Sequence, residues 1–186
     1  MEDMTIYYAG ILKVLSQSTR MTIVDRLRDE ERCVADLVRD ITTPEKEMSQ
    51  PNLSRHLAVM LSYGILDLRK DGHKTLYRLK HRLAVLALVD YARTRSNHAQ
   101  VLTAIAQITR LRIVEALRDG ESLAPAIITA VAGEQSNTAR HLSQMRTDGV
   151  VDSRRVGFRS AYWLVDRDYV LNLVDAARAI VTLTRV

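Results

Sequence analysis

The string Gln50-Pro51-Asn52-Leu53-Ser54-Arg55-His56-Leu57 returns 85 positions later as Gln135-Ser136-Asn137-Thr138-Ala139-Arg140-His141-Leu142. An earlier string, residues 17–29, recurs 90 positions later as residues 107–119. The Ile-Val dipeptide and the Leu-Arg-Asp tripeptide stand at the same places in both. Self-similarity of this kind is the signature of a repeated structural unit. The sequence therefore predicts two tandem domains, residues 1–95 and 96–186, the first with about five extra residues between its two strings.

Length and composition agree with two small soluble domains. The chain has 186 residues, of which 47% are hydrophobic and 26% charged, as in ordinary globular proteins. No apolar run reaches the ~18 residues that a membrane-spanning helix needs. The start, Met1-Glu2-Asp3-Met4, does not resemble a secretory signal. We therefore expect a cytoplasmic protein that has no membrane partner.

The charge of the chain predicts a polyanionic partner. The net charge is +5 and the pI about 9.6. Only five of the 27 basic side chains are lysines, which leaves 22 arginines (27 − 5). The guanidinium group forks onto phosphate groups and guanine edges better than an ammonium group does. A bias in genomic base composition would produce the same excess, so both explanations stay open.

The order of elements predicted for each unit is helices, then a β-hairpin, then a helix. The spacing of apolar residues and the turn and capping residues define these elements. For the first unit the predicted elements are a helix over residues 6–15, a second helix capped by Thr19 and ending near Asp29, a third over residues 34–39, a loop at Pro44, a fourth helix capped by Ser49 with Pro51 in its first turn and ending at Gly64, hairpin strands 65–70 and 75–79 around Asp71-Gly72, and a helix over residues 82–93.

The second unit repeats this order. Its hairpin is predicted over residues 150–155 and 160–165 around Gly157, and its last helix over residues 169–182. This is the order of a winged helix-turn-helix. The predicted fold class is therefore mainly α with small β-hairpins (α+β), built as two tandem winged helix-turn-helix domains.

The fourth helix and its counterpart are the predicted DNA-reading elements, because a helix-turn-helix lays its second helix in the major groove. When the leucines of each helix face inward, polar side chains face outward, and Gln and Asn suit adenine edges while Arg suits guanine or phosphate. The alternative is an ordinary solvated helix face, but the same residue types recur in both copies. The outward residues are Gln50, Asn52, Arg55 and His56 in the first copy, and Gln135, Asn137, Arg140 and His141 in the second, with Gln144 as a further candidate.

The two hairpins are the predicted second contact element. Basic side chains on such wings can lie along the phosphate backbone or enter the minor groove. The alternative is a sheet edge that charge protects from aggregation. The basic residues are Arg69, Lys70, His73, Lys74 and Arg78 on the first hairpin, and Arg154, Arg155 and Arg159 on the second.

Residues 15–23, residues 49–57 and Gly64-Ile65-Leu66 together resemble the arsenic-repressor (ArsR) family of winged helix-turn-helix transcriptional regulators. The string ending in Ser54-Arg55-His56-Leu57 is the most specific part. The resemblance implies a homodimer whose first and last helices form the dimer interface, and repression by occupation of palindromic operators. It also implies, for many members, release of DNA when a metal binds.

Two features depart from that family pattern. Cys33-Val34-Ala35-Asp36 keeps at most one of the paired cysteines of metal-sensing members, and the last helix of each unit lacks spaced histidines. We therefore expect no regulatory metal and no cofactor. The segment of residues 42–46 has a shorter counterpart, Ala132-Gly133-Glu134, in which Glu134 replaces the capping Ser49. One unit is then the weaker DNA reader, and the sequence does not say which.

The sequence carries no pattern typical of an enzyme. There is no Ser/His/Asp set at useful spacing, no glycine-rich phosphate loop and no pair of acids within a metal motif. Cys33 is the single cysteine, which excludes an intramolecular disulfide and favours a neutral thiol over a redox sensor.

The predicted function is a sequence-specific double-stranded DNA-binding transcriptional regulator, a repressor, that acts as a homodimer or an intramolecular pseudo-dimer. The alternatives are a replication initiator of plasmid or viral type and a tandem winged-helix scaffold that binds protein. A small-molecule effector bound between the repeats stays an open alternative, although no set of residues in the sequence indicates one.

Overall fold

The computed structural model describes residues 4–44, 47–132 and 135–185 of the chain, and of Arg185 it describes the backbone only. Met1 to Asp3, and with them most of the segment compared with a secretory signal, lie outside the described residues. The same holds for Glu45 and Lys46 of the extra segment and for Gly133 and the proposed poor cap Glu134.

The first part of the chain alternates short helices with three strands. Its elements are α1 (Thr5–Leu15), α2 (Ser18–Arg26), β1 (Arg32–Cys33), α3 (Val34–Ile41), α4 (Gln50–Ser62), β2 (Leu66–Asp71), β3 (Lys74–Leu79) and α5 (Arg82–Ala92). The rest of the chain forms α6 (His98–Ile105), α7 (Ile108–Ala116), β4 (Ser122–Leu123), α8 (Ala124–Val131), α9 (Gln135–Thr147), β5 (Val151–Val156), β6 (Arg159–Leu164) and α10 (Arg167–Arg185). We call α1 to α5 the first half and α6 to α10 the second half.

The two halves share one topology. The elements α7, β4 and α8 begin 90 positions after α2, β1 and α3, whereas α9, β5 and β6 begin 85 positions after α4, β2 and β3. The sheets have the equivalent strand orders β1-β3-β2 and β4-β6-β5. Their registers are also equivalent, because Cys33 pairs with Leu76 and Leu123 with Ala161. The change in spacing found in the sequence is therefore reproduced element by element.

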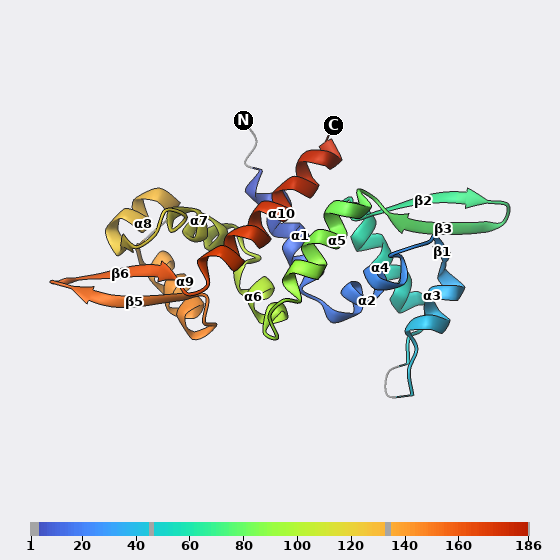
Figure 1. Cartoon of the computed structure of the whole chain (residues 1–186), viewed down its shortest axis with the longest axis horizontal. Helices are drawn as coiled ribbons and strands as arrows, with labels where there is room; N and C mark the ends of the chain where they lie inside the picture. Colours follow the sequence, from blue (N-terminus) through green and yellow to red (C-terminus); the bar gives the residue numbers. More distant parts are fainter. Residues whose placement is uncertain (1–3, 45–46, 133–134, 186) are drawn as a thin grey trace.

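The middle of the molecule is helical, and the two hairpins project from opposite ends (Figure 1). Helix α10 crosses this middle and packs against α1 and α5, while α1 also packs against α6 and α7. The buried residues form a single cluster that includes Leu12 and Leu15 of α1, Leu102 of α6 and Leu173 of α10. Burying each such leucine contributes roughly 1.5–3 kcal/mol, so the two halves stabilise one another through a shared core.

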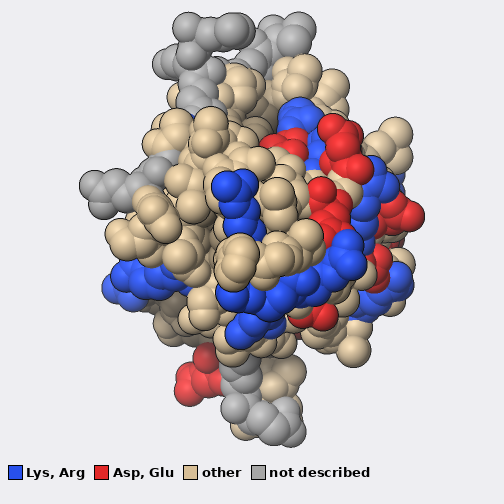
Figure 2. All heavy atoms as spheres, turned by 90° about the vertical axis from the view of Figure 1, so that its left-hand side faces the viewer, with Lys and Arg blue, Asp and Glu red and all other residues tan. Residues whose placement is uncertain are grey.

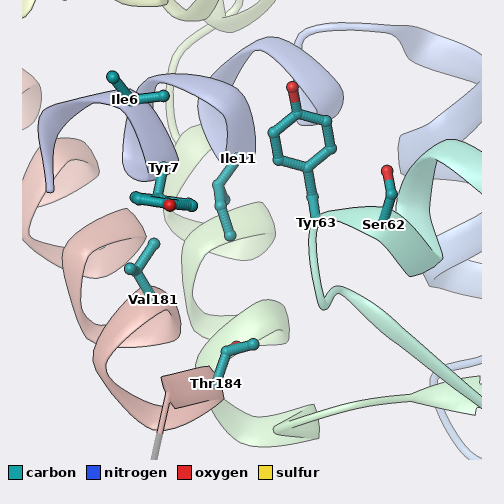
Figure 3. A pocket seen from close by; sticks show the side chains of 7 residues that line it. All are labelled: Ile6, Tyr7, Ile11, Ser62, Tyr63, Val181 and Thr184. Carbon is teal, nitrogen blue, oxygen red and sulfur yellow. The ribbon is translucent and has the colours of Figure 1, made fainter. Parts of the chain in front are cut away.

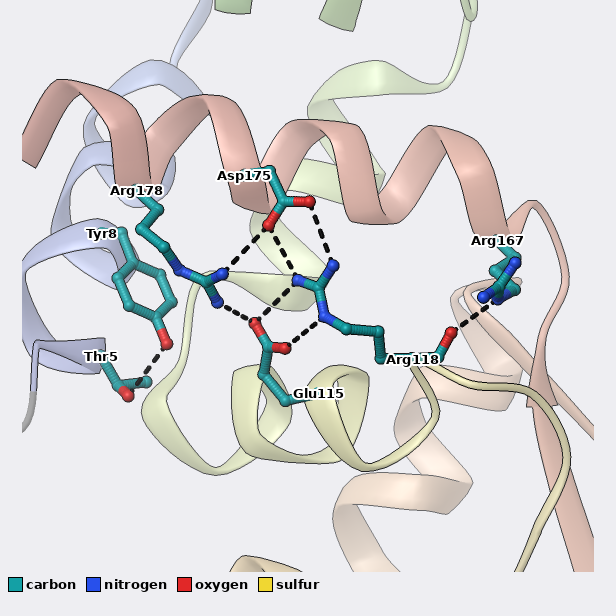
Figure 4. Close-up of polar contacts among 7 residues, drawn as sticks. All are labelled: Thr5, Tyr8, Glu115, Arg118, Arg167, Asp175 and Arg178. Atoms are coloured by element: carbon teal, nitrogen blue, oxygen red, sulfur yellow. Dashed lines mark hydrogen bonds and ion pairs between the residues drawn. The ribbon is translucent and has the colours of Figure 1, made fainter.

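Ion-pair networks fix the second helix of each half to its last helix. In the second half Arg118, which follows the end of α7, donates to Glu115 of α7 at 2.7 Å and to Asp175 of α10 at 2.8 Å, and Arg178 also donates to Glu115 (Figure 4). The guanidinium of Arg178 lies over the ring of Tyr8 from α1, 5.5 Å from its centroid. This network therefore also reaches the first half.

The first half has the corresponding network. Arg28, which follows the end of α2, donates to Asp90 of α5, and Arg93 donates to Asp25 of α2 at 2.6 and 2.7 Å. These four residues stand at the positions of Arg118, Asp175, Arg178 and Glu115, respectively, in the second half. The same polar arrangement therefore holds α2 against α5 and α7 against α10.

Aromatic side chains form part of the contact between α5 and α10. Tyr169 is buried and donates its hydroxyl to the Ala92 carbonyl at 2.6 Å, while its ring stacks on Tyr91 with centroids 5.6 Å apart. Burial raises the pKa of Tyr169 to about 12, so the phenol stays protonated and keeps donating this hydrogen bond.

The structure corrects several details of the expected boundaries. The second helix begins at Ser18 with Gln17 at its N-cap, so Thr19 is not the cap but a buried residue of the first turn. Ser49 does occupy the N-cap of α4, yet its hydroxyl makes no capping hydrogen bond. Asp71 ends β2 instead of forming the turn, which consists of Gly72 and His73. The last helix is longer than expected, because α10 spans Arg167–Arg185.

Candidate nucleic-acid interface

The outward face of α4 carries the polar residues expected from the sequence. Leu53, Leu57 and Met60 of α4 are buried in the core, which turns the opposite face of the helix to solvent. Gln50, Asn52 and Arg55 are exposed on that face, whereas His56 is half-buried. Among the described residues, the side chain of Arg55 makes neither an ion pair nor a hydrogen bond. Three of the four predicted residues are thus available to a ligand on one helix face.

The outward face of α9 is similar but more internally bonded. Gln135 and Arg140 are exposed, while Asn137 and His141 are half-buried. The guanidinium of Arg140 donates to the Asn137 side-chain oxygen at 3.3 Å. Asn137 therefore orients Arg140, a contact that Asn52 and Arg55 lack in the first half within the described residues.

His141 is held by a residue outside the helix-turn-helix. Arg110 of α7 donates to the His141 Nδ1 at 3.4 Å and to the Ala104 carbonyl at 3.0 Å. Burial lowers the pKa of His141, and the charges of Arg110 and Arg140 lower it further. The imidazole is therefore neutral near pH 7 and accepts a hydrogen bond from Arg110. Gln107, Arg110, Arg140, His141 and Gln144 line an open cavity of about 280 Å³ beside α9.

Arg20 holds the place of Arg110 in the first half but has different surroundings. Its Nη1 donates to the Val14 carbonyl at 3.4 Å, while its buried Nε has no hydrogen-bond partner among the described residues. Burial lowers the pKa of Arg20. At the position where Arg110 approaches Asp148 at 3.7 Å, the first half has Tyr63.

Arginines near the base of both wings are paired with acids, and on the first wing the predicted residue Arg78 donates to Asp67 at 2.7 Å. Arg69 donates to Glu31 at 2.7 Å, and the equivalent Arg154 donates to both oxygens of Glu121 at 2.9 and 3.0 Å. The hydrogen bond from Arg154 to Glu121 raises the pKa of Arg154. These three predicted residues therefore carry less free charge than the sequence pattern indicates.

The remaining basic wing residues lie closer to the hairpin tips. Lys70 is exposed and donates to the Thr75 hydroxyl at 3.0 Å, and Lys74 is exposed at the start of β3. Arg155 and Arg159 are exposed, and their side chains form no ion pair with any other described residue. Figure 2 looks onto the second-half end of the molecule, where Lys and Arg side chains form a band across the lower part and acidic side chains gather on the right.

Sequence reasoning missed the tip of the second wing. Phe158 is 99% exposed at the turn between β5 and β6, next to Arg159, and Val156 beside it is also exposed. Phe158 stands 85 positions after His73, so aligning the two copies would have found this difference.

The described residues hold no group of three His, Cys, Asp or Glu side chains placed to bind a metal ion. The Cys33 thiol donates to the Asp36 carboxylate at 3.0 Å, and this hydrogen bond lowers the pKa of Asp36. Within the part of the chain that the structure covers, no helix is both long and apolar enough to cross a membrane.

Residues 17–67 match the family model described as bacterial regulatory protein, arsR family. This range runs from the N-cap of α2 into β2 and so contains α3 and α4. The chain is 38% identical over 73 residues to the arsenical resistance operon repressor of Staphylococcus aureus, which covers 39% of this chain and 65% of that protein. It is 35% identical over 79 residues to the HTH-type transcriptional repressor SmtB of Mycobacterium tuberculosis. These residues are 42% of this chain and 55% of that protein. The match thus spans 55 to 65% of the length of these relatives.

Among solved structures, the chain is similar to a homodimeric winged helix-turn-helix DNA-binding domain of Mycobacterium bovis, a possible ArsR-family regulator. The sequence identity is 28% and the TM-score 0.40, over 50% of this chain and 81% of that one. It is also similar to NolR from Sinorhizobium fredii, at 27% identity and a TM-score of 0.41, over 49% of this chain and 90% of that one.

Proposed function

We propose that this chain is a sequence-specific double-stranded DNA-binding transcriptional regulator, a repressor of the ArsR type. Its two halves, residues 1–95 and 96–186, are tandem winged helix-turn-helix domains that arose by duplication. The observation that carries the proposal is the pair of matching helix faces, since Gln50 and Arg55 on α4 and Gln135 and Arg140 on α9 are all exposed at equivalent positions. The match of residues 17–67 to the arsR family supports it.

In this proposal α4 and α9 are the recognition helices. Arg55 and Arg140 read guanine edges, and the Gln and Asn side chains of the same faces read adenine edges. His56 and His141 lie at the edges of these faces and complete the contact surface. The hairpins contact phosphates through Lys70, Lys74, Arg155 and Arg159, with Arg69 and Arg154 at their bases.

The chain acts as an intramolecular pseudo-dimer. The helical middle of α1, α5, α6 and α10 takes the place of a dimer interface and connects two readers at opposite ends. A dimer of whole chains would then present four readers to a longer operator. A regulator of this kind works in the cytoplasm, next to the DNA that it controls.

Selection of bound duplexes from a random pool, followed by footprinting, tests the proposal. We expect one preferred site with two dissimilar half-sites. Arg55→Ala and Arg140→Ala should each cost about 1–3 kcal/mol of binding free energy and relax specificity in one half-site. Arg26→Ala, an exposed arginine on α2, is the control and should leave affinity unchanged. If neither Arg55→Ala nor Arg140→Ala changes the affinity for any duplex, the assignment of α4 and α9 is wrong.

The wings are tested by salt dependence. Each phosphate contact contributes about 0.9 to the slope of log affinity against log salt. Replacing both Arg155 and Arg159 with Gln should reduce the slope by about 2 and weaken all sequences alike. Arg154→Gln, which removes an arginine already paired with Glu121, should reduce the slope less. An unchanged slope in the double variant would exclude the second wing from the interface.

A further inference from the structure

A cavity of about 310 Å³ lies where the first and last helices of the chain meet the end of α4 (Figure 3). Ile6, Tyr7 and Ile11 of α1 form one wall and Val181 and Thr184 of α10 form another. Ser62 and Tyr63, at the C-terminal end of α4, form the third wall. The cavity is therefore built by both halves, next to a proposed recognition helix.

The lining of this cavity is apolar and uncharged. Ile6, Ile11 and Val181 contribute aliphatic surface, and Tyr7 and Tyr63 contribute aromatic rings. The side-chain polar atoms of these residues are hydroxyls, and none of the Lys, Arg, Asp or Glu side chains that the structure describes lines the site. A volume near 300 Å³ is at the lower end of the range of small-molecule sites. A charged ligand would lose its hydration without a partner there, so this chemistry selects a small neutral molecule with an apolar or aromatic body.

The cavity depends on a feature that distinguishes the two halves. Helix α5 ends at Ala92, and the equivalent position in α10 is Ala177, after which α10 continues to Arg185. Val181 and Thr184 belong to this extension, and α5 has no such continuation because it ends at Ala92. In the second half Gln100 of α6 stands at the position of Gly10. It donates to the Asp148 carbonyl at 3.4 Å, so a polar contact joins α6 to the end of α9.

The walls of the cavity also hold the end of α4 in place. A Cβ on Gly10 would lie 2.0 Å from the Tyr63 ring, so the ring packs directly on the α1 backbone. A Cβ on Gly64 would lie 2.6 Å from the Thr184 methyl group, so α10 packs equally closely on the residue that terminates α4. These contacts leave no free space between α1, α10 and the end of α4. A molecule that enlarges the cavity must therefore move Tyr63 and the end of α4.

We propose that this cavity is an effector site for a small neutral apolar or aromatic molecule, and that its occupation lowers the DNA affinity of the α4 half. The binding part of the proposal stands on the cavity alone. The regulatory part rests on the proposed function, because it requires that α4 reads DNA. A ligand has this effect only if it binds the DNA-free arrangement of α4 more tightly than the DNA-bound one.

Titration of the full chain with 2-naphthol tests binding without DNA. This probe has an aromatic body and one hydroxyl that stays protonated at neutral pH, and 2-naphthoate is its anionic counterpart. We expect saturable binding of 2-naphthol with a Kd on the order of 0.1 mM, because a molecule with so few non-hydrogen atoms can gain only a limited binding free energy. The anion should bind at least about tenfold more weakly. Amide NMR shifts should change at Tyr63 and Val181. Absence of saturable binding, or equal binding of both probes, would overturn the site.

Two variants of α10 locate the probe. Val181→Phe fills the cavity and should weaken 2-naphthol binding by about tenfold or more. Leu183→Phe introduces the same ring two residues later, at a side chain that is 48% exposed and does not line the cavity, and should leave the Kd unchanged. Unfolding curves show whether each variant is folded. Should a folded Val181→Phe protein bind 2-naphthol as the parent does, the assignment of this cavity is wrong.

The regulatory part is tested with the duplex obtained by selection. Saturating 2-naphthol should weaken binding of the half-site read by α4 by about fivefold or more, and the half-site read by α9 less. Val181→Phe should abolish the effect. Probe binding without any change in DNA affinity would refute the coupling but keep the site. A chain that binds no duplex would refute the proposed function, and the titration alone would then decide the site.

Discussion

The two halves of the molecule agree where they build the scaffold and differ around the proposed DNA-contacting elements. Strand order, strand register and the arginine–carboxylate networks are the same in both. The differences are Tyr63 against Asp148 at the end of the proposed recognition helix, and His73 against Phe158 at the wing tip. A residue in the shared core is constrained by neighbours on all sides, whereas His73 and Phe158 lie at the surface and can differ without cost to packing. Tyr63 and Asp148 lie at the edge of the core, and each has its own neighbour, Gly10 for Tyr63 and Arg110 for Asp148.

The consequence is that equivalent positions have unequal neighbours. Arg110 contacts His141 and approaches Asp148, while Arg20 keeps one buried nitrogen without a partner among the described residues. The end of α4 packs on α1 and α10 through two glycines, while the end of α9 is joined to α6 by the Gln100 hydrogen bond. Substitutions at matched positions should therefore have different effects, and this can be measured.

The largest difference is expected for the glycines that end α4 and α9. Gly64 and Gly149 have φ of +68° and +73°, so alanine at either should cost about 1 kcal/mol of folding free energy from backbone strain. Gly64→Ala should lose about 1–3 kcal/mol more, because its Cβ would meet Thr184, whereas nothing lies within 4 Å at Gly149. Urea unfolding measures both. Adding Thr184→Ala to Gly64→Ala should recover the excess, and equal losses in the two single variants would contradict the close packing of α10.

The ion-pair networks come next. Arg118 donates to two carboxylates, which raise its pKa, and it should be worth about 1–2 kcal/mol of stability. Arg28 donates to Asp90 and lies 3.8 Å from Asp25, and Arg28→Ala should cost about 0.5–1 kcal/mol because these groups are more open to screening. Thermal unfolding of Arg118→Ala and Arg28→Ala compares them. A larger loss for Arg28→Ala would reverse our ranking of the two networks.

The wing tips offer a smaller test, which depends on the proposed function. An exposed aromatic ring beside arginines suits insertion into a minor groove or stacking on a base. Phe158→Ser should weaken specific DNA binding by about 1 kcal/mol, and His73→Ser by less. Neither change should alter unfolding, since Phe158 is 99% exposed. Equal effects on affinity would mean that the two wings meet DNA in the same way.

The smallest effect is a pH dependence from His141. Its pKa is lowered in the fold, so below an unfolded pKa of about 6.5 the unfolded chain binds more protons than the folded one. Stability from this residue is therefore fully present above about pH 6.5 and is lost as the pH falls toward the lowered value. His141→Gln should reduce the loss of stability between about pH 6.5 and 5 by less than about 1 kcal/mol. His73→Gln serves as the exposed control.

Local sequence patterns determine much of this arrangement. The step from a 90- to an 85-residue offset, found in the sequence, reappears in the starts of α7, β4, α8, α9, β5 and β6 relative to their counterparts, because apolar spacing and turn residues act locally. Helix α6 is the exception, since it begins 93 positions after α1. The same local rule predicted that Gln50, Arg55, Gln135 and Arg140 face outward, since Leu53 and Leu142 must face the core. It was less successful at helix starts, where the Thr19 cap was wrong because packing of α2 buries that residue.

What only the tertiary structure decided is which distant side chains meet. Glu31 and Glu121 neutralise Arg69 and Arg154, and Arg110 reaches His141 from another helix. The cavity joins Tyr7 to Val181, at opposite ends of the chain. Periodicity says which face of a helix is apolar, but the angle and depth at which two helices pack depend on all their contacts together. The repeat, the order of helices and hairpins and the outward faces were therefore contained in the sequence. The pairing of charges arises only when each half folds, and the cavity proposed as an effector site arises only when the two halves pack against each other.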